Sequence, residues 1–166
     1  MFQSVISRFA GACRTLATGL AATFCAAVAT SCADGAADKE EEAVAAAAEA
    51  FASCYFNYDF AGARPYCTEG SLKWLSFAAS NVTQTDLDVL KTQREGAECE
   101  ADDIELTADT TAEAVLKVTN VMLTDTLGRP GRIVDEAVFT VKLVRRSGRW
   151  LVRMEGLPQS GKRNRG

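Results

Sequence analysis

Cysteine is the residue type in this chain whose chemistry is easiest to place, because the chain has six cysteines and no histidine. Cys32 follows the small residues Ala29-Thr30-Ser31, at the end of an uncharged run over residues 15–33 that Arg8 and Arg14 precede. A basic start, an apolar middle and small residues before a cleavage point are typical of an export signal. We therefore expect residues 1–31 to be a signal peptide and the mature chain to begin at Cys32.

The residues around Cys32 resemble the lipobox of bacterial lipoproteins, in which the cysteine thiol is diacylated before cleavage. Thr30, Ser31 and Cys32 fit that pattern, whereas Ala29 stands where the family usually has leucine. The resemblance implies a membrane anchor at Cys32 made of acyl chains such as palmitate, because two acyl chains hold a protein on a bilayer where one does not.

Two other fates of this segment are weighed against the lipid anchor. Ordinary cleavage after Ala27-Val28-Ala29, an A-x-A site, would release a soluble periplasmic or secreted protein. A retained transmembrane helix fits less well, because residues 15–33 are mostly Ala, Thr, Gly and Ser. The lipoprotein is favoured, and release by ordinary cleavage stays open.

Residues 32–41 are acidic and predict a solvated tether between the anchor and the folded domain. Its Lys39-Glu40-Glu41 piece resembles the signal that sends some Gram-negative lipoproteins to the outer face of the outer membrane. We therefore expect an outer-membrane lipoprotein of a Gram-negative envelope and leave its surface exposure open. A short acidic run also suits a helix start, because carboxylates favour the positive end of the helix dipole.

The acidic charge of the chain argues against nucleic acid as a partner. The full chain has 18 basic and 22 acidic side chains, and cleavage before Cys32 removes two arginines and no acidic residue, for a net charge of −6. The size suits one domain with a single core, which we place at residues 42–157. Residues 158–166 then form a basic, disordered tail.

Three cysteines remain in the predicted domain, an odd number that leaves one thiol unpaired. Cys54 and Cys67 lie on adjacent predicted helical segments and form the favoured disulfide, with Cys67 and Cys99 as the next choice. The chain has no C-x-x-C motif and no histidine, so we expect neither a metal site nor a cofactor. Without histidine, any acid–base chemistry would need carboxylates, tyrosine or cysteine.

Apolar residues recur at helical spacing through the first half of the domain. A first helix is predicted from Glu42 to Phe60, with a stripe made by Val44, Ala48, Phe51, Tyr55 and Tyr58. A short helical piece from Arg64 to Gly70 follows. Ser71 is placed at the start of a third helix, and residues 86–93 form a further helical turn or two.

The second half alternates apolar and polar residues, which is typical of strands. One strand is predicted around Ile104, a second after the turn at residues 109–111, a third from Ile133 to Leu143, and a fourth after the Ser147-Gly148 hairpin turn. Helices followed by an antiparallel meander predict an α+β domain, in which a sheet of about four strands curls over the N-terminal helices.

These elements resemble the cystatin-like cone fold of the nuclear transport factor two-like superfamily, particularly its small bacterial lipoproteins of unknown function. The resemblance rests on the first helix ending in Tyr58-Asp59-Phe60-Ala61-Gly62-Ala63, on the shorter helices, and on the closing Gly148-Arg149-Trp150-Leu151-Val152. It implies a pocket between helix and sheet. The residues expected near that pocket are Tyr55, Asp59, Tyr66, Trp74 and Phe139.

The resulting expectation is a lipid-anchored envelope protein whose cone domain binds a small ligand or an envelope partner protein. Such a domain can also pair with a second copy through its sheet face. The alternative is a cofactor-free enzyme that isomerises or dehydrates a small molecule, for which Asp59 would be the nearby carboxylate. No catalytic motif supports that alternative, and the fold alone leaves the activity open.

Overall fold

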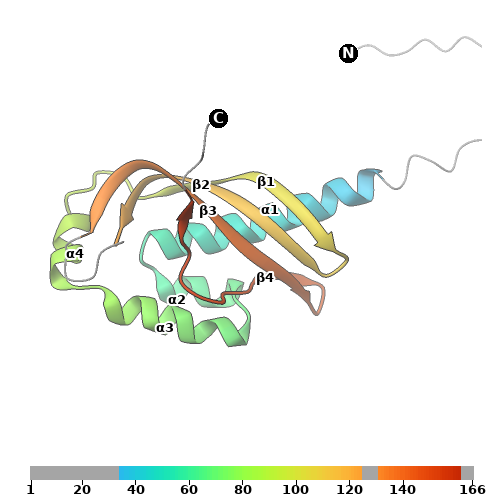
Figure 1. Cartoon of the computed structure of the whole chain (residues 1–166), viewed down its shortest axis with the longest axis horizontal. Coiled ribbons are helices and arrows are strands. Elements are labelled where there is room, and N and C mark those ends of the chain that lie inside the picture. The colour runs from blue at the N-terminus through green and yellow to red at the C-terminus, as the bar shows by residue number, and fades with distance from the viewer. Residues whose placement is uncertain (1–33, 125–130, 162–166) are drawn as a thin grey trace, which may run out of the picture. The chain divides into compact units, whose positions relative to one another are not determined.

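Helices come first along the chain and strands last, as the sequence predicts (Figure 1). The computed structural model describes residues 34–124 and 131–161. The predicted signal peptide, Cys32 and the end of the basic tail lie outside these residues. In the described part, the long helix α1 crosses one face of a curled antiparallel sheet (Figure 1).

Helix α1 spans Asp34–Phe56, so it begins well before the predicted start at Glu42. The expected tether is therefore wrong for residues 34–41, which are helical. Alanine, glutamate and lysine are strong helix formers, and Glu40 is also held by contacts with the sheet. The predicted apolar stripe is confirmed for Val44, Ala48 and Phe51, which are fully buried.

The chain turns sharply after α1, where Tyr58 has a φ of 64°, in the left-handed region that ends helices. Helix α2 (Phe60–Ala63) and the 3₁₀ turns η1 (Arg64–Tyr66) and η2 (Glu69–Ser71) follow. Helix α3 (Leu72–Asn81) begins beside Ser71 as predicted, and α4 spans Gln84–Leu90. No helix among residues 34–124 and 131–161 is long and apolar enough to cross a membrane.

The sheet is a meander of β1 (Glu98–Ala108), β2 (Thr111–Leu123), β3 (Arg132–Arg146) and β4 (Arg149–Val152). Two register shifts in β1 and a positive φ at Asn120 in β2 interrupt the regular ladder, which promotes the curl. The predicted β3–β4 hairpin is confirmed. Ser147 and Gly148 both have positive φ, as a two-residue type I′ turn requires.

The segment after β4 returns to the sheet as β5 (Ser160–Gly161), which pairs with Val138 and Phe139 of β3. The predicted disordered tail is therefore wrong for residues 158–161. A pairing of two residues carries almost no sequence signal, because it depends on the strand beside it.

The core lies between α1 and the sheet. Its largest fully buried side chains include Phe51, Leu75, Leu116 and Leu143, each at most 2% exposed. Burying side chains of this kind contributes about 1.5–3 kcal/mol each. The start of α1 and the β1–β2 and β3–β4 turns lie at one end of the described domain, and α4 lies at the other (Figure 1).

Candidate functional site

A pocket of about 260 Å³ lies between the end of α1, the end of α3, strands β2 and β3, and the segment that leads into β5. Aromatic and aliphatic side chains make most of its wall, among them Tyr55, Tyr58, Phe60, Met122 and Phe139. Residues 157–160 close one side. We refer to this hollow as the aromatic pocket.

The rings of the aromatic pocket pack on one another. Tyr55 meets Phe56 and Phe60 edge to face, with centroids 5.2 and 5.5 Å apart, and stacks on Phe51 at 5.3 Å. The Phe56 and Phe139 centroids are 4.3 Å apart, which joins the helix to the sheet. Such pairs contribute about 0.5–1.5 kcal/mol beyond the area they bury, so this wall is well ordered.

Tyr58 brings a polar group to the wall. Its hydroxyl donates to the Met122 carbonyl oxygen at 3.3 Å. Burial, together with the negative charge of Asp86, raises the pKa of Tyr58 to about 12, although a hydrogen bond with Thr124 acts in the opposite direction. Burial, and then Tyr58, also raises the pKa of Tyr55 well above its ordinary value. Both phenols are therefore neutral at physiological pH and can donate or accept hydrogen bonds.

Asp86 lies behind Tyr58 as a buried carboxylate, 3% exposed. It accepts from the Gly131 amide at 2.8 Å, from the Thr83 amide at 2.9 Å and from the Thr83 hydroxyl at 2.7 Å. Burial acts to raise the pKa of Asp86, but these hydrogen bonds outweigh it and hold the pKa below its ordinary value. Asp86 thus joins the start of α4 to the start of β3 as an ionised carboxylate that accepts three hydrogen bonds.

Sequence reasoning did not select Asp86, although Thr83-x-x-Asp86 is the spacing of a capping box. The helical stripe predicts Tyr58 in the first helix, and Tyr58 is not among the predicted pocket residues. In the closing segment, Leu157 is the last residue of the predicted domain, and residues 158–160 belong to the predicted tail. Only the Thr83–Asp86 spacing was visible as a local pattern.

The structure brings two of the five predicted pocket residues together. Tyr55 and Phe139 line the aromatic pocket. Asp59 instead caps α2, where its carboxylate accepts from the Gly62 amide at 2.8 Å. Tyr66 packs against the core from η1, and Trp74 lines a different hollow on the outside of the sheet.

The three cysteines of the domain are free thiols in the structure, so no bond joins Cys54 to Cys67. Burial raises the pKa of Cys67 to about 12, and burial together with Glu49 raises that of Cys99 to about 11. These thiols are therefore weak nucleophiles, since the thiolate is the reactive form. No cluster of carboxylates and thiols suited to a metal occurs among the residues that the structure describes.

No protein-family model and no curated protein matches the chain. Similar solved structures include an NTF-2 like protein of unknown function from Shewanella oneidensis, at 13% identity and a TM-score of 0.43, covering 70% of this chain and 94% of that one. A protein of unknown function from Mycobacterium tuberculosis is 13% identical, with a TM-score of 0.49 and coverage of 81% and 79%. An NTF2-like protein involved in plasmid conjugation is 15% identical, with a TM-score of 0.37 and coverage of 71% and 47%.

These neighbours are similar in fold alone, so we infer the function of this chain from its own residues. The chain folds into an α+β domain in which a long helix packs against a curled antiparallel sheet.

Proposed function

We propose that this chain is a lipid-anchored protein of the bacterial cell envelope whose cone domain holds a small apolar ligand in the aromatic pocket. The basic start, the apolar run and the small residues before Cys32 support the anchor. The observation that carries the ligand proposal is the pocket wall. Its described residues include four aromatic rings near the end of α1 and no carboxylate, amine or guanidinium group.

The volume of the aromatic pocket limits the size of the ligand. At about 260 Å³ it is slightly smaller than the roughly 300–1,000 Å³ of pockets that hold drug-sized molecules. A single aromatic ring system or a short acyl chain fits this volume. The Tyr58 hydroxyl already donates its proton to the Met122 carbonyl oxygen, so its oxygen and the Thr124 hydroxyl can accept a hydrogen bond from one polar group of such a ligand.

The wall supports binding over acid–base catalysis. Two carboxylates close to these rings, Asp59, which precedes Phe60, and Asp86, whose charge acts on Tyr58, are occupied by hydrogen bonds at helix starts. Tyr58 keeps its proton at physiological pH, with a pKa near 12, so it is a poor general base. The available chemistry is apolar contact with a few neutral hydrogen bonds, which is that of a binding pocket.

Calorimetric titration of the purified full-length protein with indole and with octanoate tests the ligand proposal. Ala78, 8% exposed, lies in the pocket wall, and its neighbour Ala79 is exposed. Ala78→Leu fills the pocket and should weaken binding about tenfold or more, whereas Ala79→Leu should leave it unchanged. Equal affinity in both variants, or no binding of either probe to wild type, would overturn the proposal.

The anchor is tested separately, by intact mass and detergent partitioning of the native protein. Wild type should begin at Cys32, carry acyl mass and enter the detergent phase, and Cys32→Ala should not. Cys25→Ala, within the predicted signal, is the control and should behave as wild type. A soluble wild-type protein that begins at Thr30 would contradict the anchor and leave the pocket proposal untouched.

A further inference from the structure

A second hollow lies on the outside of the β3–β4 hairpin, where η2 and the start of α3 meet it. Its volume is about 880 Å³ and it is open to solvent. Val144 and Leu151 form its apolar floor, on side chains that alternate with the core residues of these strands. We call it the outer groove. It shares no lining residue with the aromatic pocket.

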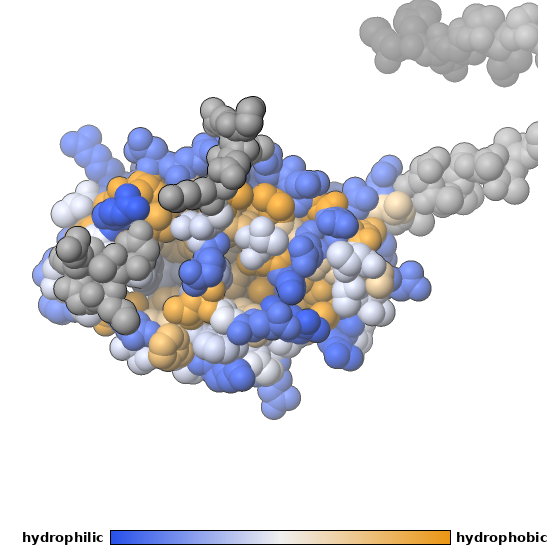
Figure 2. Space-filling model, viewed as in Figure 1, coloured by the Kyte–Doolittle hydropathy of each residue, from blue (hydrophilic) through white to orange (hydrophobic). Residues whose placement is uncertain are grey.

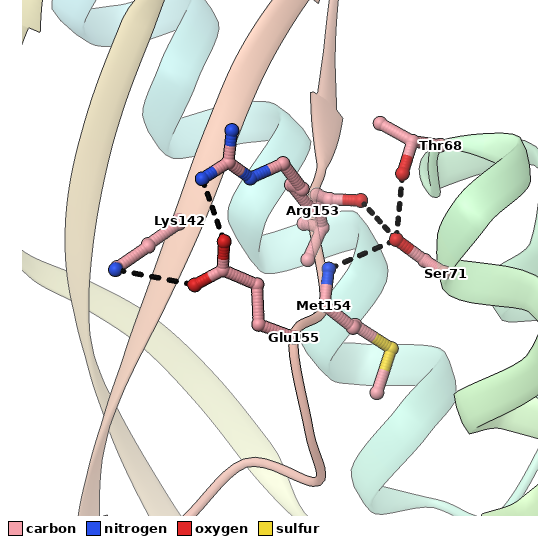
Figure 3. Close-up of polar contacts among 7 residues, drawn as sticks. Thr68, Ser71, Lys142, Arg153, Met154 and Glu155 are labelled. Atoms are coloured by element: carbon pink, nitrogen blue, oxygen red, sulfur yellow. Dashed lines mark hydrogen bonds and ion pairs between the residues drawn. The ribbon is translucent and has the colours of Figure 1, made fainter.

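Hydrogen bonds fix the wall of the outer groove (Figure 3). The fully buried hydroxyl of Ser71 accepts from the Met154 amide at 2.9 Å and donates to the Val152 carbonyl oxygen at 3.2 Å. Since a hydroxyl has one proton, the Thr68 hydroxyl must be the donor in its 2.7 Å bond with Ser71. The Thr68 amide also donates to Val152 O at 3.0 Å. The groove is therefore preformed, which lowers the cost of binding.

The rim of the groove has charges of both signs. Lys73, Arg146 and Arg153 are exposed cations, and Glu69 and Glu155 are exposed carboxylates. Glu155 is held by Arg153 at 2.7 Å and by Lys142 at 3.4 Å, with both partners directed at its carboxylate (Figure 3). The rim thus offers hydrogen-bond donors and acceptors side by side, with a small excess of positive charge.

An aromatic ring completes the groove. Trp74 lines it and is half-buried, with the Lys73 ammonium 5.3 Å from its ring centroid and Phe77 edge-on at 6.3 Å. Phe77 is 51% exposed, so this ring pair lies at the surface. Figure 2 shows hydrophobic residues in orange between hydrophilic residues in blue on the face of the domain that it draws.

We infer that the outer groove binds an oligosaccharide that carries carboxylate groups, such as a chain of uronic acids. Sugar hydroxyls both donate and accept hydrogen bonds, so they suit a rim on which Glu69 and Glu155 lie among the cations, and the excess of positive charge favours sugars that carry carboxylates. The C–H face of a sugar ring packs on an indole, which is a flat apolar surface. Arg146 can take a sugar carboxylate in a bidentate pair. The open shape admits an extended chain.

Titration of the full-length protein with hexagalacturonate, maltohexaose and hexaglutamate, followed by NMR, tests this inference. The chain has two tryptophans, so its spectrum has two indole N–H signals. The Trp74 signal should move with hexagalacturonate. The Trp150 indole, which donates to Glu40 inside the molecule, should stay in place and report that the fold is intact.

Single substitutions separate the contribution of the Trp74 ring to binding from that of the Arg146 charge. Trp74→Ala should weaken hexagalacturonate binding about tenfold or more, and Trp74→Phe should retain part of it and serves as the second variant if the alanine protein does not fold. Arg146→Gln should reduce the affinity for hexagalacturonate to that for maltohexaose. Arg94→Gln, an exposed arginine away from the groove, should change nothing.

Three results would overturn the inference. The first is hexaglutamate binding as tightly as hexagalacturonate, since the groove would then recognise charge alone. The second is full affinity in both Trp74 variants. The third is no response to either saccharide while the Trp150 signal shows a folded protein.

Discussion

The indole N–H of Trp150 donates a hydrogen bond to the carboxylate of Glu40, with 3.0 Å between nitrogen and oxygen. The other oxygen of Glu40 is 2.9 Å from the Arg145 guanidinium. One carboxylate thus fastens the first turns of α1 to the β3–β4 hairpin. The helix that follows the predicted anchor site is therefore part of the folded domain.

Glu40→Ala should lower the free energy of unfolding by about 1–3 kcal/mol, because it leaves the indole N–H of the buried Trp150 without its charged acceptor. Urea unfolding measures the change. Glu41→Ala is the matched control, since Glu41 is an exposed carboxylate on the same helix. Equal stability of the two variants would show that the Glu40 contacts do not hold the helix.

Ser71→Ala should also destabilise the protein by about 1–3 kcal/mol, because the buried Met154 amide loses its acceptor. Ser76→Ala should be close to neutral. Ser76 is exposed, its hydroxyl bonds only within α3, and alanine favours helix. If the two substitutions cost the same in thermal unfolding, the Ser71 hydrogen bonds do not hold the groove wall.

The lowered pKa of Asp86 predicts that the free energy of unfolding falls in acid. Its pKa is below the ordinary value of 3.8, so its contribution is complete above that pH and is lost as the pH falls through the folded-state pKa. Asp86→Asn should be less stable than wild type at neutral pH, and the difference should shrink as the pH falls below about 4. Unfolding free energies measured across this range check the prediction. A difference that is constant with pH would contradict it.

The raised pKa of Cys67 predicts that the free energy of unfolding falls in alkali. Burial raises its pKa from 9 to about 12, so its contribution is complete below pH 9 and is lost as the pH rises toward 12. Cys67→Ala should therefore show a shallower fall in stability over this range than wild type. The measurement is the slope of the unfolding free energy against pH between 9 and 12, since losing the buried sulfur lowers stability at every pH. Parallel curves for the two proteins would count against burial as the cause.

The parts of the fold that were predictable from the sequence are those with local causes. The Ser147-Gly148 turn, the helical stripe of Val44, Ala48 and Phe51, and the order of helices before strands all follow from neighbours in the chain. The start of α1 was misjudged because the alanine and glutamate of a solvated tether are also good helix formers. Whether residues 34–41 form a tether or a helix depends on a long-range contact, the hydrogen bond from Trp150 to Glu40.

The aromatic pocket was only half predictable for the same reason. Tyr55 and Phe139 lie on regular elements whose buried faces follow from periodicity. Asp59 and Tyr66 follow the left-handed turn at Tyr58, after which helical spacing no longer tells where a side chain lies. Residues 157–160 reach the pocket because β5 pairs with the middle of β3, a contact that no local pattern indicates.

The most direct test of the aromatic pocket is an NMR measurement of contacts between bound indole and the full-length protein. We predict nuclear Overhauser contacts from the indole protons to the rings of Tyr55 and Phe139, and their loss in Ala78→Leu. Contacts to Trp74 in the outer groove instead, or bound indole with no contact to either ring, would contradict the account.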